Sequence, residues 1–102
     1  MILLVGRGAT MPERYLLVRW PGGPEQRIYS PSTVVEDYFR AGQKLPIADF
    51  VRRSHEALTI ASDRVEAAYG FPCNRAARSM AEIAEFAAVH RDGDVTIEGI
   101  EA

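Results

Sequence analysis

Residues 14–29, RYLLVRWPGGPEQRIY, consist of two short segments on either side of a Pro-Gly-Gly-Pro tetrapeptide. In the first segment, Leu16, Val18 and Trp20 alternate onto one face, which is typical of a strand that is buried on one side. The tetrapeptide stops this strand, and its glycines supply the positive φ angles that a chain reversal needs. The stretch therefore predicts a β-hairpin, with residues 25–29 as the returning strand.

Three helices are predicted after the hairpin. Ser30-Pro31 has the residues of a helix N-cap and first helical position, which predicts a short helix over residues 31–40. Residues 46–69 form the longest amphipathic segment, and Gly70 follows as a suitable C-cap. A third, alanine-rich helix is predicted over residues 73–90, and its inner stripe is expected to be Ala76, Ala77, Met80, Ile83, Ala84 and Ala87.

The last segment, residues 95–100, alternates like a strand after an Asp-Gly turn. The order of elements is therefore β-β-α-α-α-β. This order predicts the α+β class, with a three-stranded, mostly antiparallel sheet packed against three helices. We expect a single domain over residues 11–102. Residues 1–10 differ in pattern from the rest, and Met11 offers a second start, so we interpret them as an N-terminal extension or the result of an alternative start.

The charge balance is slightly acidic, with 12 basic and 14 acidic side chains and a net charge of −2. A nucleic-acid-binding domain normally has a basic surplus, so nucleic acid is not the expected partner. The single cysteine allows no internal disulfide, which fits a reducing compartment. The apolar run at residues 2–5 is shorter than the ~7–15 residues of a signal peptide or the ~20 of a membrane helix. We therefore expect a cytoplasmic protein without membrane contact.

Cys73 is the strongest candidate for a reactive side chain. It is expected in the first turn of a helix, where free N–H groups and the helix dipole favour a thiolate, and Arg75 and Arg78 follow within about one turn. A nucleophilic thiol also needs a base, and the chain has only two histidines, His55 and His90. The alternative interpretation is that Cys73 is a small, half-buried apolar residue at a helix start.

Four side chains are candidates for ligand binding, two as aromatic surfaces and two as anion-binding guanidinium groups, namely Trp20, Tyr29, Arg75 and Arg78. In a domain of this size most aromatic side chains belong to the core, and arginines on helices often pair with acidic neighbours. No metal site is expected, because the His55-Glu56 pair lacks a second histidine at position 59. No cofactor is expected either.

Four stretches of the chain form an ordered set, and they are Arg19-Trp20-Pro21-Gly22, Tyr29-Ser30-Pro31-Ser32, the segment from Ala57-Leu58 to Ala61-Ser62-Asp63-Arg64-Val65, and Tyr69-Gly70-Phe71 with Cys73, Arg75 and Ala76. Over residues 11–100 this set resembles a family of short bacterial proteins, the nitrogen-starvation response proteins. The resemblance implies genes nearby for a nitrilase, a radical SAM protein, an acetyltransferase and a flavin-dependent oxidoreductase. It implies a pathway that handles nitriles or cyanide-derived nitrogen, but no activity and no catalytic residues.

Three functions are consistent with these observations. The first is a small non-enzymatic accessory protein of nitrogen assimilation. It would contact a partner enzyme of the same gene cluster, or a second copy of itself, through a helix face or a sheet edge. The second is a thiol-dependent enzyme or carrier that uses Cys73. In it, Arg75 and Arg78 would be anion clamps, and His55 or His90 would be the base. The third is a nucleic-acid-binding regulator. For a homodimer, we expect the closing strand to leave a sheet edge that a second copy can cover.

Overall fold

The computed structural model describes residues 12–90 and 92–102, so the N-terminal segment that the sequence sets apart lies outside the described residues. The elements in chain order are β1 (Arg14–Arg19), β2 (Glu25–Ser30), α2 (Val35–Tyr38), β3 (Lys44–Pro46), α3 (Ile47–Tyr69), α4 (Asn74–Val89) and β4 (Asp94–Glu101). The predicted α+β class and the hairpin β1–β2 are confirmed.

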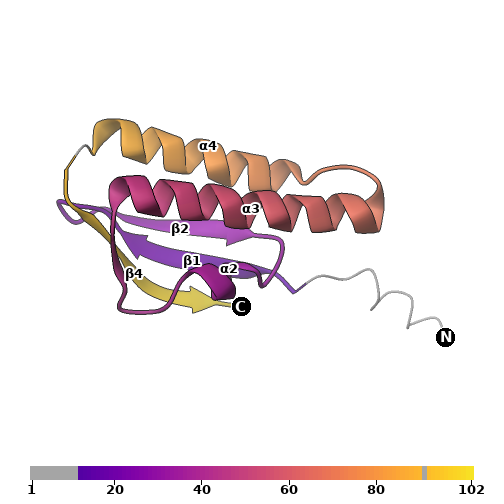
Figure 1. Cartoon of the computed structure of the whole chain (residues 1–102), viewed down its shortest axis with the longest axis horizontal. Coiled ribbons are helices and arrows are strands. Elements are labelled where there is room, and N and C mark those ends of the chain that lie inside the picture. Colours follow the sequence, from indigo (N-terminus) through magenta and orange to yellow (C-terminus); the bar gives the residue numbers. More distant parts are fainter. Residues whose placement is uncertain (1–11, 91) are drawn as a thin grey trace.

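The strands form one antiparallel sheet in the order β2-β1-β4-β3. The long helices α3 and α4 run antiparallel to each other along one face of this sheet (Figure 1). We call the opposite face the open face, and its side chains on the three longer strands include Tyr15, Leu17, Arg19, Glu25, Arg27, Tyr29, Thr96, Glu98 and Glu101. Its charged members are exposed and are linked by ion pairs, such as that from Arg19 Nε to Glu98 Oε2 at 2.8 Å.

The prediction of a three-stranded sheet is wrong, because the described residues contain a fourth strand. β3 has only three residues, of which Leu45 alone is buried, so it lacks the alternation by which a strand is recognised. β4 pairs with both β1 and β3 and therefore lies inside the sheet. On the side away from β1, β3 pairs only with residues 94–96 of β4, so the closing strand is only partly enclosed. The expected homodimer contact at its edge stays a prediction.

The predicted helix over residues 31–40 is reduced to the single turn of α2. Ser30 is the last residue of β2 rather than a helix cap, and its hydroxyl donates to the Ser32 carbonyl oxygen at 2.7 Å. The Ser32 hydroxyl in turn accepts from the Val34 N–H at 3.3 Å. Serine side chains stabilise turns as well as helix N-termini. In this chain Ser30 and Ser32 stabilise the turn between β2 and α2.

The two long helices begin and end within one residue of their predicted bounds. Gly70 follows α3 with a φ angle of 90°, a left-handed conformation that glycine adopts without strain. The buried residues of α4 are Ala76, Ser79 and Ile83. Ala77 and Ala84, which were expected inside, are exposed. Alanine is common on both faces of a helix, so it does not mark the buried side.

The core lies between the sheet and the two long helices, and Trp20 is its largest fully buried side chain. Three rings surround the indole with centroids 5.4–5.5 Å away, namely Phe50 from α3, Phe86 from α4 and His90 just after α4. The indole N–H donates to Gln26 Oε1 at 2.8 Å, so its polar atom is paired. One aromatic cluster thus attaches both helices to the sheet.

Candidate functional site

The second residue of α4, Arg75, reaches over the edge strand β2. Its guanidinium carbon lies 3.6 Å from the centroid of the Tyr29 ring, within the range of a cation–π contact. Arg75 Nη2 also donates to the Tyr15 hydroxyl at 3.4 Å. Glu13 Oε2 accepts from the Tyr29 hydroxyl at 2.8 Å and lies 3.9 Å from Arg75 Nη1. Two of the predicted ligand-binding residues, Tyr29 and Arg75, are therefore in direct contact.

A second stacked pair adjoins the first on the open face. Tyr15 lies opposite Tyr29 in the hairpin, and their rings meet edge to face with centroids 5.6 Å apart. The guanidinium carbon of Arg27 lies 3.7 Å from the centroid of the Tyr15 ring. We call Glu13, Tyr15, Arg27, Tyr29 and Arg75 the tyrosine–arginine cluster. Each of its two rings is covered by one guanidinium group.

The hydrogen-bond roles in the tyrosine–arginine cluster follow from its electrostatics. Burial, together with the neighbouring Glu13 carboxylate, raises the pKa of Tyr29 far above its ordinary value. The Tyr29 hydroxyl therefore stays protonated and remains a donor to Glu13. The hydrogen bond to Tyr15 raises the pKa of Arg75, which keeps its positive charge. The cluster presents guanidinium N–H groups to solvent, because Arg27 and Arg75 are exposed whereas the two tyrosines are half-buried.

Residues of the helical layer fix the position of Tyr29 from behind. The Ser79 hydroxyl of α4 donates to the Tyr29 carbonyl oxygen at 2.8 Å. The turn after β2 is held to α3 by a hydrogen bond from Arg64 Nη1 to the Ser32 hydroxyl, also at 2.8 Å. Three of the four stretches that carry the family resemblance thus meet at this end of the molecule. Part of their similarity has an architectural explanation.

Cys73 is the N-cap of α4. Its Sγ accepts from the Ala76 N–H at 3.4 Å, and its own N–H donates to the Ser62 hydroxyl at 3.1 Å. The side chain is partly buried, as the structural interpretation of this residue expects. The capping contact explains why a small side chain with an acceptor atom stands at this position.

Neither candidate base lies beside Cys73. His90 follows the other end of the 16-residue α4, which at 1.5 Å per residue is about 24 Å away. His55 is seven residues before Ser62, the α3 residue that contacts Cys73, or about 10 Å along the helix axis. Arg78 is exposed and, within the described residues, forms no ion pair. The elements of the thiol hypothesis are not assembled into one site.

Replacing Cys73 by alanine should lower the free energy of unfolding by about 0.5–1 kcal/mol, because the N-cap acceptor is lost. Cys73→Ser should leave stability equal or slightly higher, since a hydroxyl caps a helix better than a thiol. Urea unfolding followed by far-UV circular dichroism measures both changes. Equal losses in the two variants would show that the sulfur matters for its packing and not for the cap.

Trp20 does not join the tyrosine–arginine cluster. It is 1% exposed on the helix-covered face of the sheet, whereas Tyr29 lies on the open face. Sequence reasoning missed Tyr15, Arg27 and Glu13 as members of the cluster. A signal for Tyr15 was present, because a hairpin that reverses at residues 21–24 brings Tyr15 opposite Tyr29.

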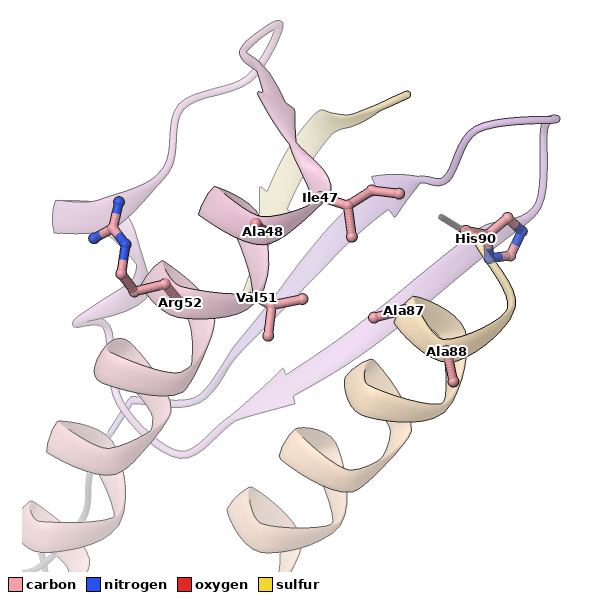
Figure 2. A pocket seen from close by; sticks show the side chains of 7 residues that line it. All are labelled: Ile47, Ala48, Val51, Arg52, Ala87, Ala88 and His90. Carbon is pink, nitrogen blue, oxygen red and sulfur yellow. The ribbon is translucent and has the colours of Figure 1, made fainter. Parts of the chain in front are cut away.

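A second surface feature is a shallow groove between the start of α3 and the end of α4, with a volume of about 710 Å³. Figure 2 shows Ile47 and Val51 of α3 pointing towards Ala87 of α4, while Arg52 extends away from α4 at the rim. The lining is mostly apolar and also includes Ala48, Ala88 and His90.

The described residues contain neither a group of metal-ligating side chains nor a helix that could cross a membrane. Over residues 12–90 and 92–102, no three His, Cys, Asp or Glu side chains are grouped closely enough to hold a metal ion. Neither long helix in this part of the chain is apolar enough over a sufficient length to cross a bilayer.

The fold and its surfaces define a small α+β protein in which a helical hairpin covers one face of an antiparallel sheet and tyrosine–arginine stacks lie on the other. The chain belongs to the family described as nitrogen starvation-induced protein NitG, whose family model matches residues 15–100. The resemblance to nitrogen-starvation response proteins is thereby confirmed. No curated protein and no solved structure matches the chain.

Proposed function

We propose that this protein is a non-enzymatic accessory protein of the nitrogen-starvation response that binds an enzyme handling nitrile-derived nitrogen. Membership of the NitG family supports the association with nitrogen starvation. The enzyme class is suggested by the genes that the family resemblance implies, among them a nitrilase. An accessory role fits a domain whose arginine side chains are ordered by stacking on its surface and are suited to protein binding.

The observation that carries the proposal is the tyrosine–arginine cluster. Tyrosine and arginine are enriched among the residues that dominate protein–protein binding energies, since they combine large contact area with hydrogen bonding. Here stacking already orders both guanidinium groups, at 3.7 Å and 3.6 Å from the ring centroids, so little side-chain entropy remains to be lost on binding. The cluster is a preorganised contact surface.

Charge indicates the chemistry of the partner surface. Arg27 Nη2 lies 3.8 Å from Glu101 Oε1, and Arg75 Nη1 lies 3.9 Å from Glu13 Oε2. Both distances are at the limit of an ion pair. Elsewhere on the open face Arg19 makes a 2.8 Å hydrogen-bonded contact with Glu98. Arg27 and Arg75 therefore keep N–H donors for carboxylates of a partner, and we expect an acidic surface segment of the enzyme to dock here.

This function is tested by titrating the purified protein with each enzyme encoded beside its gene, using isothermal calorimetry. One enzyme is expected to bind, and Arg75→Glu should weaken that binding at least tenfold, because it places a carboxylate against the acidic segment. The matched control is Arg40→Glu, a reversal at an exposed arginine after α2. Absence of binding by every neighbouring enzyme, or equal effects of the two variants, would contradict the proposal.

The second candidate function remains a thiol-dependent enzyme or carrier that uses Cys73. The observation in its favour is that Sγ accepts a hydrogen bond from a helix N-terminal N–H while the side chain stays partly accessible. Its distinguishing result would be turnover of a nitrile-derived or thiol substrate that Cys73→Ser abolishes without loss of stability. The accessory function expects Cys73→Ser to bind the partner enzyme like the parent chain.

A further inference from the structure

We propose that α3 and α4 pack face to face with the same two helices of a second copy of this chain, with the groove between them at the centre of a two-fold interface. This surface lies on the opposite side of the sheet from the tyrosine–arginine cluster. The inference is therefore independent of the proposed function, and both contacts can exist together.

The apolar groove extends along the outer side of the helical hairpin. Beyond the part shown in Figure 2, a neighbouring hollow continues it between Val51 and His55 of α3 and Met80 and Ala84 of α4. Val51 lines both parts, so the two are continuous. Within the described residues nothing covers this surface, which a second helical surface can remove from water.

The exposed charges on the two helices are ordered in opposite senses. Along α3, the positive Arg52 is followed one turn later by the negative Glu56. α4 runs antiparallel beside it, and the hollows that join residues 51–55 to residues 80–84 align the two helices. At the level of Arg52, α4 carries the negative Glu85, and at the level of Glu56 it approaches the positive Arg78.

A two-fold axis along the groove places α3 of one copy over α4 of the other at the same levels. Arg52 then faces Glu85 of the second copy, and Glu56 faces Arg78 of the second copy. The two-fold axis repeats both contacts, and each of them joins opposite charges. Within the described residues, Arg78 and Glu85 form no ion pair. Arg52 lies 3.4 Å from an Asp49 oxygen and 3.8 Å from a Glu56 oxygen of its own helix. The surface is therefore complementary to itself.

The size of the interface predicts its strength. The 16 residues of α4 give an overlap about 24 Å long, and two helices side by side are about 20 Å wide. Each copy would bury roughly 500 Å² and the pair about 1,000 Å², at the lower limit of specific interfaces. The exposed Ala77, Ala81 and Ala88 leave room on α4 for the larger side chains of α3. We expect a reversible dimer with a dissociation constant in the micromolar range.

Sedimentation equilibrium of the full chain from about 1 μM to about 1 mM tests this inference. The parent chain should pass from monomer to dimer. Arg52→Glu and Glu85→Arg should each weaken the dimer about tenfold, since each creates two symmetric like-charge contacts. The double variant with both changes restores opposite charges and should dimerise like the parent chain.

Ala81→Glu offers a second variant, because Ala81 is exposed and its replacement should leave the monomer folded while blocking the contact. Its control is Ala67→Glu, at an exposed alanine of α3. α4 begins beside Ser62 of α3, and Ala67 lies beyond that point, outside the overlap of the two helices. A chain that stays monomeric at about 1 mM overturns the inference. The inference is also overturned if Ala81→Glu leaves the dissociation constant of the dimer unchanged. The same holds if the double variant Arg52→Glu with Glu85→Arg does not dimerise like the parent chain.

Discussion

Trp20→Ala should lower the free energy of unfolding by about 4–6 kcal/mol, which is close to the whole stability of many domains of this size. Removing a fully buried aromatic side chain costs about 3–5 kcal/mol through lost burial and the cavity left behind. Here the indole also lies against rings from both long helices, with centroids 5.4–5.5 Å away, so the cavity opens at the junction of all layers.

The loss of the indole N–H adds to this effect. Gln26 is only 9% exposed, and its Oε1 accepts the N–H of Trp20 at 2.8 Å. Among the residues that the structure describes, Gln26 Nε2 already has no hydrogen-bond partner, so the variant leaves both polar ends of a buried amide unpaired. An unsatisfied buried polar atom costs about 1–3 kcal/mol.

Urea unfolding followed by far-UV circular dichroism measures this loss, because Trp20 is the only tryptophan and its fluorescence disappears in the variant. Trp20→Phe is the control, since it retains an aromatic ring and removes the N–H, and it should cost about 1–3 kcal/mol. A loss below about 1 kcal/mol for Trp20→Ala would contradict the core assignment. Trp20→Phe should also leave partner binding unchanged.

Gly93→Ala should cost about 2–4 kcal/mol, the second largest effect we expect. Gly93 has a φ angle of 109°, where a side chain strains the backbone by about 1–3 kcal/mol. In addition, a Cβ at this position would lie 2.9 Å from both Cβ and Cγ of Pro21, closer than real contacts allow. Either the hairpin turn or the turn before β4 must shift, which adds an overpacking cost of about 1–3 kcal/mol.

Gly23 provides a matched control. Its φ angle is also 109°, but a Cβ there would meet no atom of the described residues within 4 Å. Gly23→Ala therefore measures backbone strain alone, and the difference between the two variants measures the contact with Pro21. Thermal or urea unfolding of both variants gives this difference. Equal losses would mean that Pro21 moves aside freely and that the two turns are not packed together.

Much of the fold could be predicted because several elements have a complete local pattern. The hairpin has alternation and a turn sequence, and α3 and α4 have apolar periodicity and clear ends. β3 could not be predicted, since three residues with one buried side chain carry no period. The helix predicted over residues 31–40 is too long, because Ser30 and Ser32 stabilise a turn with the same residue type that caps helix N-termini.

The candidate site was predicted only in part, for a different reason. Tyr29 and Arg75 were recognised singly by their chemistry, but their contact depends on how α4 lies across β2. Such a contact joins residues 46 positions apart in the sequence and has no local signature. The separation of His90 from Cys73, by contrast, follows from the predicted helix over residues 73–90, because these two residues stand at its opposite ends.

The place of β4 inside the sheet has a consequence for how the chain acquires its structure. β1 and β4 are neighbours although Arg19 and Glu98 are 79 residues apart in sequence. The hairpin β1–β2 and the helix pair α3–α4 can form from nearby residues, whereas the sheet cannot be completed until the last strand arrives between β1 and β3. During synthesis on the ribosome, the edge of β1 that β4 covers therefore stays unpaired until almost the entire chain has been made, and an unpaired strand edge is a place where chains can aggregate.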